Sequence, residues 1–164
     1  MKIKKSQPAF TLIEVLIATI MIGLAIAALL GANGAYTMAN SYGADMSTAE
    51  FLIEQIRERT MTMAVIDPET EKDIFGPEEG SVTSYDDVDD FNDASFSPPI
   101  DAGGNALDDL AAFKQEVEVQ NVSPTNFANT VASHTSNFVR IRVTVSKNDQ
   151  AISEASWIRV YLEP

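Results

Sequence analysis

One continuous apolar stretch dominates the hydrophobic and polar pattern at the start of the chain. It covers 21 positions, residues 10–30, and a single charged side chain, Glu14, interrupts it. At a rise of 1.5 Å per residue, an α-helix of this length measures about 31 Å, which is enough to cross the hydrocarbon core of a bilayer. Three lysines precede the stretch, Lys2, Lys4 and Lys5, and they favour a cytoplasmic position for that end. The pattern predicts one transmembrane helix, with the rest of the chain on the opposite side of the membrane.

Further along, the apolar positions change to spacings of three and four residues. Most charged side chains fall outside the resulting stripe, which is typical of a helix that is half-buried against a domain. The pair Asp67-Pro68 ends the pattern, because a residue before proline is displaced from the α region. We therefore expect one long helix, with its transmembrane half at residues 10–30 and its extracytoplasmic continuation at residues 31–66. The stripe consists of Ala49, Leu52, Ile53, Ile56, Thr60 and Met63.

Alternation with a period of two, the pattern of a half-buried strand, marks the last third of the chain. Valine and glutamate alternate over residues 116–119, and a second alternating run covers residues 139–146. A short polar turn joins that run to a third one rich in β-formers, which is typical of a β-hairpin. We expect residues 113–164 to form a small antiparallel sheet that packs on the helix stripe, with residues 123–137 as an exposed loop. The predicted fold class is α+β.

Residues 67–112 lie between the predicted helix and the predicted sheet. They are predominantly acidic, contain several Pro and Gly residues and show no sustained periodicity, so we expect a long loop region. Within it, Tyr85, Val88 and Phe91 recur at every third position. This spacing would pin the segment onto the helix while the neighbouring aspartates face outward.

Four closely spaced carboxylates in this region, Asp86, Asp87, Asp89 and Asp90, are candidate metal ligands. Ca²⁺ takes six to eight oxygen ligands, and clustered aspartates together with backbone carbonyls can supply them. The spacing is not that of an EF-hand, in which Gly is sixth and Glu is twelfth. The alternative is a solvated loop of mutually repelling charges, which is the commoner role of an acidic run. Apart from Ca²⁺, the sequence indicates no cofactor.

Charge and composition narrow the functional classes. The 164 residues carry a formal net charge of −13, which argues against nucleic-acid binding and against docking on anionic lipid headgroups. The chain has no cysteine, so neither a disulfide nor thiolate chemistry is available to it. Its single histidine, His134, lies in a polar stretch without a second histidine, and no nucleophile-elbow motif occurs. We expect a solvated His134 and a protein that is not an enzyme.

The residues around Glu14 resemble a known processing site. The segment AFTLIEV, residues 9–15, is similar to the N-terminal motif of type IV pilins and type II secretion pseudopilins. In that family a prepilin peptidase removes a short basic leader, the new N-terminal Phe is N-methylated, and the fifth residue of the mature chain is Glu. The resemblance implies a leader at residues 1–9, cleavage between Ala9 and Phe10, methylation of Phe10 and an assembly role for Glu14. This chain departs from the family pattern in having Ala9 where Gly is usual, and it lacks the cysteines of many pilins.

Glu14 needs a partner if it is to lie in an apolar environment, since charges within membranes are rare and usually paired. Cleavage after Ala9 would give Phe10 an α-ammonium four residues away, which is the spacing of helical neighbours. Loss of the three leader lysines would change the net charge from −13 to −16. A secretory signal peptide is the competing interpretation. The apolar run, however, is longer than the usual h-region of about 7–15 residues, and no A-x-A site follows it.

The resemblance implies a structural subunit of a type IV pilus-like filament or of a secretion pseudopilus. The expected partners are other pilin subunits in a helical filament, a prepilin peptidase and methylase, and an inner-membrane assembly platform; no nucleic acid is expected. The chain would be a single-pass protein of the bacterial inner membrane with its C-terminal domain extracytoplasmic, and then part of an extracellular or periplasmic filament. The resemblance also implies that the helix loosens over residues 23–43, where glycines recur, when it packs into a filament.

Two questions stay open at this point. A similar Asp-rich segment occurs in some minor pilins, which favours a minor subunit over a major one, while pilus and secretion pseudopilus remain alternatives. The alternative function is a membrane-tethered extracytoplasmic binding domain that never assembles and uses the acidic loop as its ligand site.

Overall fold

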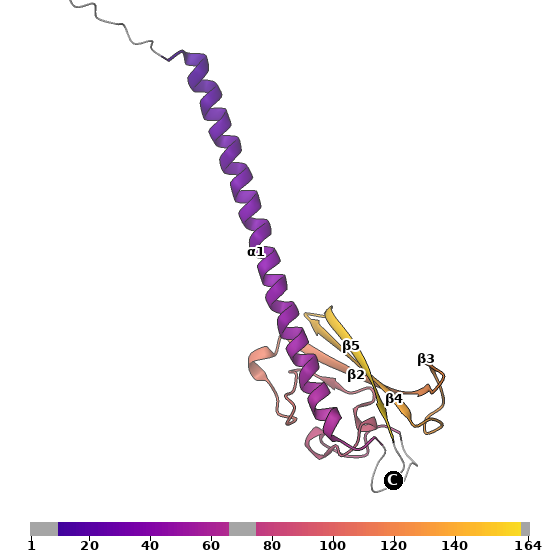
Figure 1. The fold of residues 1–164 in the computed structure, drawn as a ribbon. Coiled ribbons are helices and arrows are strands. Elements are labelled where there is room, and N and C mark those ends of the chain that lie inside the picture. Colours follow the sequence, from indigo (N-terminus) through magenta and orange to yellow (C-terminus); the bar gives the residue numbers. More distant parts are fainter. Residues whose placement is uncertain (1–9, 66–74, 162–164) are drawn as a thin grey trace, which may run out of the picture. The chain divides into compact units, whose positions relative to one another are not determined.

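A computed structural model of the chain describes residues 10–65 and 75–161 (Figure 1). The chain divides into two compact units, residues 1–43 and residues 44–164. One helix, α1 (Leu12–Thr62), contributes to both units, and the β-sheet belongs to the second. The α+β class expected from the sequence is confirmed.

The long helix predicted from the apolar pattern is also confirmed. α1 contains 51 residues and is unbroken through its four glycines, of which Gly23 is the first and Gly43 the last. It is long and apolar enough to cross a membrane, and it is the one such helix in the part of the chain that the structure describes. α1 ends at Thr62, four residues before the predicted end at residue 66, and Asp67-Pro68 lies outside the described residues. Loosening of residues 23–43 in a filament stays a prediction, because the structure is that of a single chain.

Five strands form an antiparallel sheet in the second unit (Figure 1). They are β1 (Ser95–Phe96), β2 (Phe113–Ser123), β3 (Asn126–Thr130), β4 (Phe138–Lys147) and β5 (Gln150–Val160). The order across the sheet is β1-β2-β4-β5, and β3 pairs with the end of β2. The predicted hairpin is the β4–β5 pair, which turns at Asn148 and Asp149, both with positive φ.

The alternation in the sequence becomes the two faces of this sheet. Val117 lies opposite Val143, and Val119 lies opposite Ile141, so valine and isoleucine side chains meet on the face that covers the core. Glu118 lies opposite Arg142 on the other face, which is more exposed. Each apolar side chain that is fully buried in this way contributes about 1.5–3 kcal/mol to folding.

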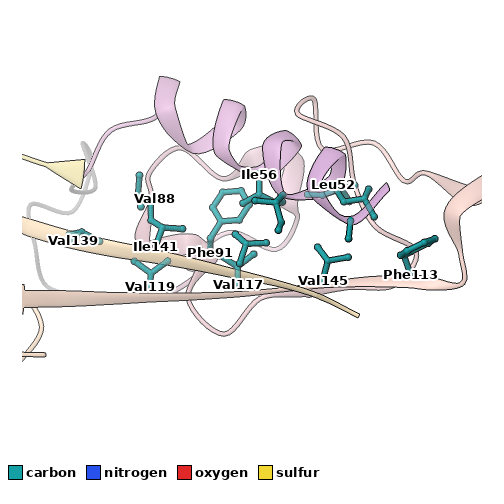
Figure 2. Packing of buried hydrophobic residues seen from close by; sticks show 14 of the residues in the cluster. Leu52, Ile56, Val88, Phe91, Phe113, Val117, Val119, Val139, Ile141 and Val145 are labelled. Atoms are coloured by element: carbon teal, nitrogen blue, oxygen red, sulfur yellow. The ribbon is translucent and has the colours of Figure 1, made fainter. Parts of the chain in front are cut away.

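The helix stripe supplies the other side of the core. Figure 2 shows Leu52 and Ile56 of α1 facing Val117 and Val145 of the sheet. All members of the stripe up to Thr60 are buried, and Met63 is partly buried. The second half of α1 therefore belongs to the folded domain, as the spacing predicted.

Two segments that the sequence analysis treated as loops are more ordered than expected. The polar stretch at residues 123–137 contains β3, whose residues are all exposed. Strand β1 lies within the acidic region and pairs with β2 through Ser95 and Phe96. The prediction that Val88 and Phe91 pin the acidic segment is confirmed, because both side chains are fully buried between helix and sheet (Figure 2).

Candidate functional site

The first candidate site is the beginning of α1, where Thr11 and Glu14 bond to each other. The backbone N–H of Glu14 donates to Oγ1 of Thr11 (3.3 Å), and the backbone N–H of Thr11 donates to Oε2 of Glu14 (3.5 Å). This is a capping box, which satisfies two backbone donors that a helix otherwise leaves without partners. The sequence analysis missed this role of Glu14, although Thr-x-x-Glu before an apolar run is its signature.

The side chains that follow are exposed throughout residues 10–43. Leu12 is 86% exposed and Leu29 is 70% exposed, which are values that single leucines of a water-soluble helix seldom reach. The polar hydroxyls in this stretch bond within the helix: Oγ1 of Thr19 donates to the carbonyl of Leu16, and Oγ1 of Thr37 donates to that of Asn33. An apolar surface this continuous requires either lipid or the apolar surfaces of other proteins around it.

The second candidate site is the acidic segment, where the predicted metal ligands lie at and before the 3₁₀ helix η2 (Asp89–Phe91). Asp87, Asp89 and Asp90 are almost completely buried, and Asp86 is exposed. The expectation that the aspartates face outward is therefore wrong for three of the four. Asp87 and Asp90 turn inward because their carboxylates accept hydrogen bonds from the backbone of their own turn, whereas Asp89 bonds to more distant residues.

These bonds use one oxygen of each carboxylate. Oδ1 of Asp87 accepts from the N–H groups of Asp89 (2.7 Å) and Asp90 (3.1 Å) and so caps η2. Oδ2 of Asp90 accepts from the N–H groups of Asp86 (3.1 Å) and Asp87 (3.4 Å). The other oxygens, Oδ2 of Asp87 and Oδ1 of Asp90, are buried without a hydrogen-bond partner in the described structure.

Asp89 connects η2 to two distant segments. Its Oδ1 accepts from the N–H of Gly76 (3.2 Å), and its Oδ2 lies 3.5 Å from Nε2 of His134. The His134 ring also lies against Phe75, with 5.6 Å between the ring centroids. The expectation of a solvated His134 is thus wrong, since its side chain is only 21% exposed. The backbone of His134 has a positive φ of 60°, and the turn at this position brings the ring toward η2.

Burial changes the protonation of this cluster. Burial, together with the negative charge of Asp89, raises the pKa of Asp87 to about 7. Burial also raises the pKa of Asp89 and of Asp90; in Asp89, the bonds with Gly76 and His134 offset part of this rise. A carboxylate that is removed from water loses hydration and becomes easier to protonate, or it requires a nearby cation. The segment is therefore poorly suited to hold its full negative charge unaided.

Two groups of three carboxylates meet here and share Asp90. In one, single oxygens of Glu78, Asp89 and Asp90 lie within 4.8 Å of one another, and in the other the same holds for Glu79, Asp86 and Asp90. The structure thus brings together three of the four predicted ligands, while Asp87 belongs to neither group. Glu78 and Glu79 were missed, because they join the cluster only through the fold of the segment that begins at Phe75.

The comparison with family models concerns the first site. Residues 4–30 match the model of the prokaryotic N-terminal methylation motif. This N-terminus is a prepilin-type methylation motif. Its presence agrees with the resemblance to type IV pilins and pseudopilins, and it lies on a helix that is long and apolar enough to cross a membrane. No curated protein and no solved structure matches the chain.

The prepilin-type motif covers Ala9, Phe10 and Glu14, the residues expected to act in processing and assembly. Ala9 lies outside the described residues. Phe10 lies just before α1 and Glu14 lies in its first turn, and both are exposed. The acidic segment and the sheet lie beyond the matched range, so their chemistry has to be argued from the contacts alone.

Proposed function

We propose that the protein is a structural subunit of a type IV pilus-like filament or of a secretion pseudopilus. A prepilin peptidase cuts the chain after Ala9, and Phe10 becomes the N-methylated N-terminus. The observation that carries the proposal is the match of residues 4–30 to the methylation motif, at the start of a helix whose side chains are exposed up to residue 43. The role is structural and requires no catalytic group.

Assembly would transfer the apolar half of α1 from lipid into a bundle of equivalent helices. Before assembly the subunit is held in the inner membrane with residues 44–164 on the extracytoplasmic side, where the assembly platform takes it up. The exposed apolar surface of residues 10–43 supports this proposal, because it suits both surroundings without a change of side chains. Exposed polar groups on such a surface would be costly in either environment.

Glu14 would determine the register of the bundle. In the single chain its carboxylate accepts from the N–H of Thr11, one residue after the amine that cleavage would create at Phe10. In the filament, Glu14 of one subunit would meet the Phe10 ammonium of a neighbour. A buried charge without its partner costs about 3–5 kcal/mol, so a subunit placed in the wrong axial position would be rejected.

The carboxylate charge and the capping hydrogen bond of Glu14 can be separated by mutation. Glu14→Gln retains an oxygen that can accept from Thr11 but removes the charge, whereas Thr11→Val removes the hydroxyl and leaves the charge. We expect Glu14→Gln to be cleaved and inserted normally but to fall at least about tenfold in its ratio of filament to membrane protein. Thr11→Val should retain the wild-type ratio.

The readout is an immunoblot of sheared filaments and of membranes from the same cells, with cleavage followed by electrophoretic mobility. Normal incorporation of Glu14→Gln would contradict the charge-pairing role. A defect in Thr11→Val alone would assign the role of this pair to helix capping instead. Absence of the wild-type chain from filaments would favour the alternative, a membrane-tethered domain that binds a ligand through the acidic segment.

The acidic segment favours a minor subunit within this proposal. The segment gives the domain a surface that the shared assembly helix does not provide. A filament needs such a distinct surface only in the few subunits at particular positions. Counting the subunits in a filament density map would decide: a chain that forms the whole filament would contradict the minor role.

A further inference from the structure

We propose that Glu78, Asp89 and Asp90 bind one Ca²⁺ ion, which fastens the acidic segment to the domain. This site lies outside the prepilin-type motif, and the inference stands whether or not the chain enters a filament. One carboxylate oxygen from each of these three residues lies within 4.8 Å of the other two. Ligands on opposite sides of a Ca²⁺ ion at about 2.4 Å are about 4.8 Å apart, so the three oxygens fit around a single ion.

A cluster of carboxylates alone would not indicate an ion, but Asp90 supplies a second observation. Its side chain is completely buried and bonds to that of Glu79, yet no hydrogen-bond donor in the described structure reaches Oδ1. Its Oδ2 is already engaged by the N–H groups of Asp86 and Asp87, so Oδ1 is the oxygen available for a ligand. A buried polar atom without a partner costs about 1–3 kcal/mol, and a cation would remove that cost.

Glu78 presents the same feature from the other side of the site. Its Oε1 is buried without a hydrogen-bond partner in the described structure, although it belongs to a loop rather than to a strand or helix. The loop is held by the bond from the N–H of Gly76 to Asp89, where Gly76 has a φ of +111° that favours glycine. Gly76 thereby places the loop that carries Glu78 beside η2, and a carboxylate oxygen of Glu78 lies within 4.8 Å of one of Asp90.

The charges gathered at the site favour a divalent cation. Glu78, Asp89 and Asp90 bring three carboxylates to one position, and the two aspartates are buried. A carboxylate that is removed from water requires a nearby cation. A Ca²⁺ ion supplies two positive charges there.

Calcium is the better match than magnesium on geometric grounds. The ligands come from an irregular loop and a short 3₁₀ turn, and their oxygens lie within 4.8 Å of one another. Ca²⁺ accepts flexible sets of six to eight oxygens, whereas Mg²⁺ demands a near-ideal octahedron at 2.0–2.1 Å. Backbone carbonyls and water would complete the calcium shell.

The neighbouring group at Glu79 and Asp86 provides an internal control. It shares Asp90 with the proposed site but uses the other glutamate of the pair. Glu78→Gln and Glu79→Gln make the same change of charge at adjacent positions. Only Glu78→Gln removes a proposed ligand, so the two variants separate the site from a general response of acidic residues to calcium.

The test is thermal unfolding of the full-length chain in nonionic detergent, followed by the fluorescence of its single tryptophan, Trp157. Each protein is measured in EGTA, in excess CaCl₂ and in MgCl₂ at equal concentration. At free Ca²⁺ about 100-fold above Kd, the folded-to-unfolded ratio increases about 100-fold, which corresponds to a rise in Tm of roughly 10 °C. The wild type, Glu79→Gln and the exposed control Asp109→Asn should all show this rise.

Glu78→Gln and Asp90→Asn should lose the calcium response. In EGTA both variants should be at least as stable as the wild type, because each removes a charge from a crowded site and an amide oxygen can still accept hydrogen bonds. Equal Tm of the wild type in EGTA and in CaCl₂ would overturn the proposal. So would an equal rise with MgCl₂, or a response lost in Glu79→Gln and kept in Glu78→Gln.

Discussion

The guanidinium of Arg159, on strand β5, donates a hydrogen bond of 3.1 Å to the carbonyl oxygen of Met63, just beyond the end of α1. A second N–H of the same group donates to the carbonyl of Thr60. The last carbonyls of a helix have no partner within it and carry partial negative charge, so a cation that bonds to them is favourable. In a domain without cysteine, this contact ties the last described strand to the end of the helix.

Replacing Arg159 should therefore destabilise the domain. Arg159→Met retains the aliphatic stem but leaves two carbonyls without a charged donor, and we expect a loss of about 1.5–3 kcal/mol in the free energy of unfolding. Urea unfolding of the full-length chain in nonionic detergent, followed by Trp157 fluorescence, measures it. Arg142→Met is the control, because its ion pairs with Glu118 and Glu154 are largely solvated and should contribute less than about 1 kcal/mol. Equal midpoints for Arg159→Met and the wild type would contradict the capping role.

Gln115 is a buried polar side chain that joins three parts of the domain. Its Nε2 donates to the carbonyls of Leu52 (2.9 Å) and Ile100 (3.2 Å), and its Oε1 accepts from the N–H of Ile100 (2.8 Å). Gln115→Leu has nearly the same volume but leaves these backbone groups buried without partners. We predict a loss of about 1–3 kcal/mol for each group that water does not reach. The exposed Gln150→Leu should change stability by less than about 0.5 kcal/mol in the same urea titration; a similar loss there would assign the effect to apolar substitution in general.

The turn of the β4–β5 hairpin predicts that two substitutions in it change the stability of the domain in opposite directions. Asn148 and Asp149 have φ values of 50° and 63°, the left-handed region that a two-residue hairpin turn requires. Asp149→Gly gives the preferred Asn-Gly pair, so the midpoint of thermal unfolding should stay the same or rise. Asn148→Val places a β-branched residue at positive φ and should cost about 1–2 kcal/mol. A valine variant as stable as the wild type would show that the turn is not formed in this way.

Alternation and helical spacing were sufficient to predict the second half of α1, β2 and β4, because each of these elements buries one face. The first half of α1 was predicted from its continuous apolar run, and β5 from its β-formers and the polar turn before it. These patterns gave no signal for β3, all of whose residues are exposed, or for β1, which is only two residues long. Those strands depend on pairing with β2 rather than on a pattern of their own. The inward direction of three aspartates was also beyond the sequence, because hydropathy places carboxylates in water. Here backbone N–H groups of the same turn bond to Asp87 and Asp90, and the N–H of Gly76 bonds to Asp89.

The residues of the candidate sites also differ in whether the sequence alone could predict them. Phe10 and Glu14 could be assigned from a local motif, since that motif consists of consecutive residues. The partnership of Glu78 with Asp89 and Asp90 depends on the fold of the segment between them, and His134 approaches Asp89 from a segment more than forty positions further along. The capping contact of Thr11 with Glu14 was within reach of the sequence, because its spacing is a known helix-start signature.

The most direct test of the filament proposal is mass spectrometry of filaments sheared from cells that produce the chain. We predict that the filament fraction contains this protein with N-methyl-Phe10 as its first residue, and that residues 1–9 are absent from it. A chain that keeps residues 1–9, or that is confined to the membrane fraction of cells whose filaments are intact, would contradict the account.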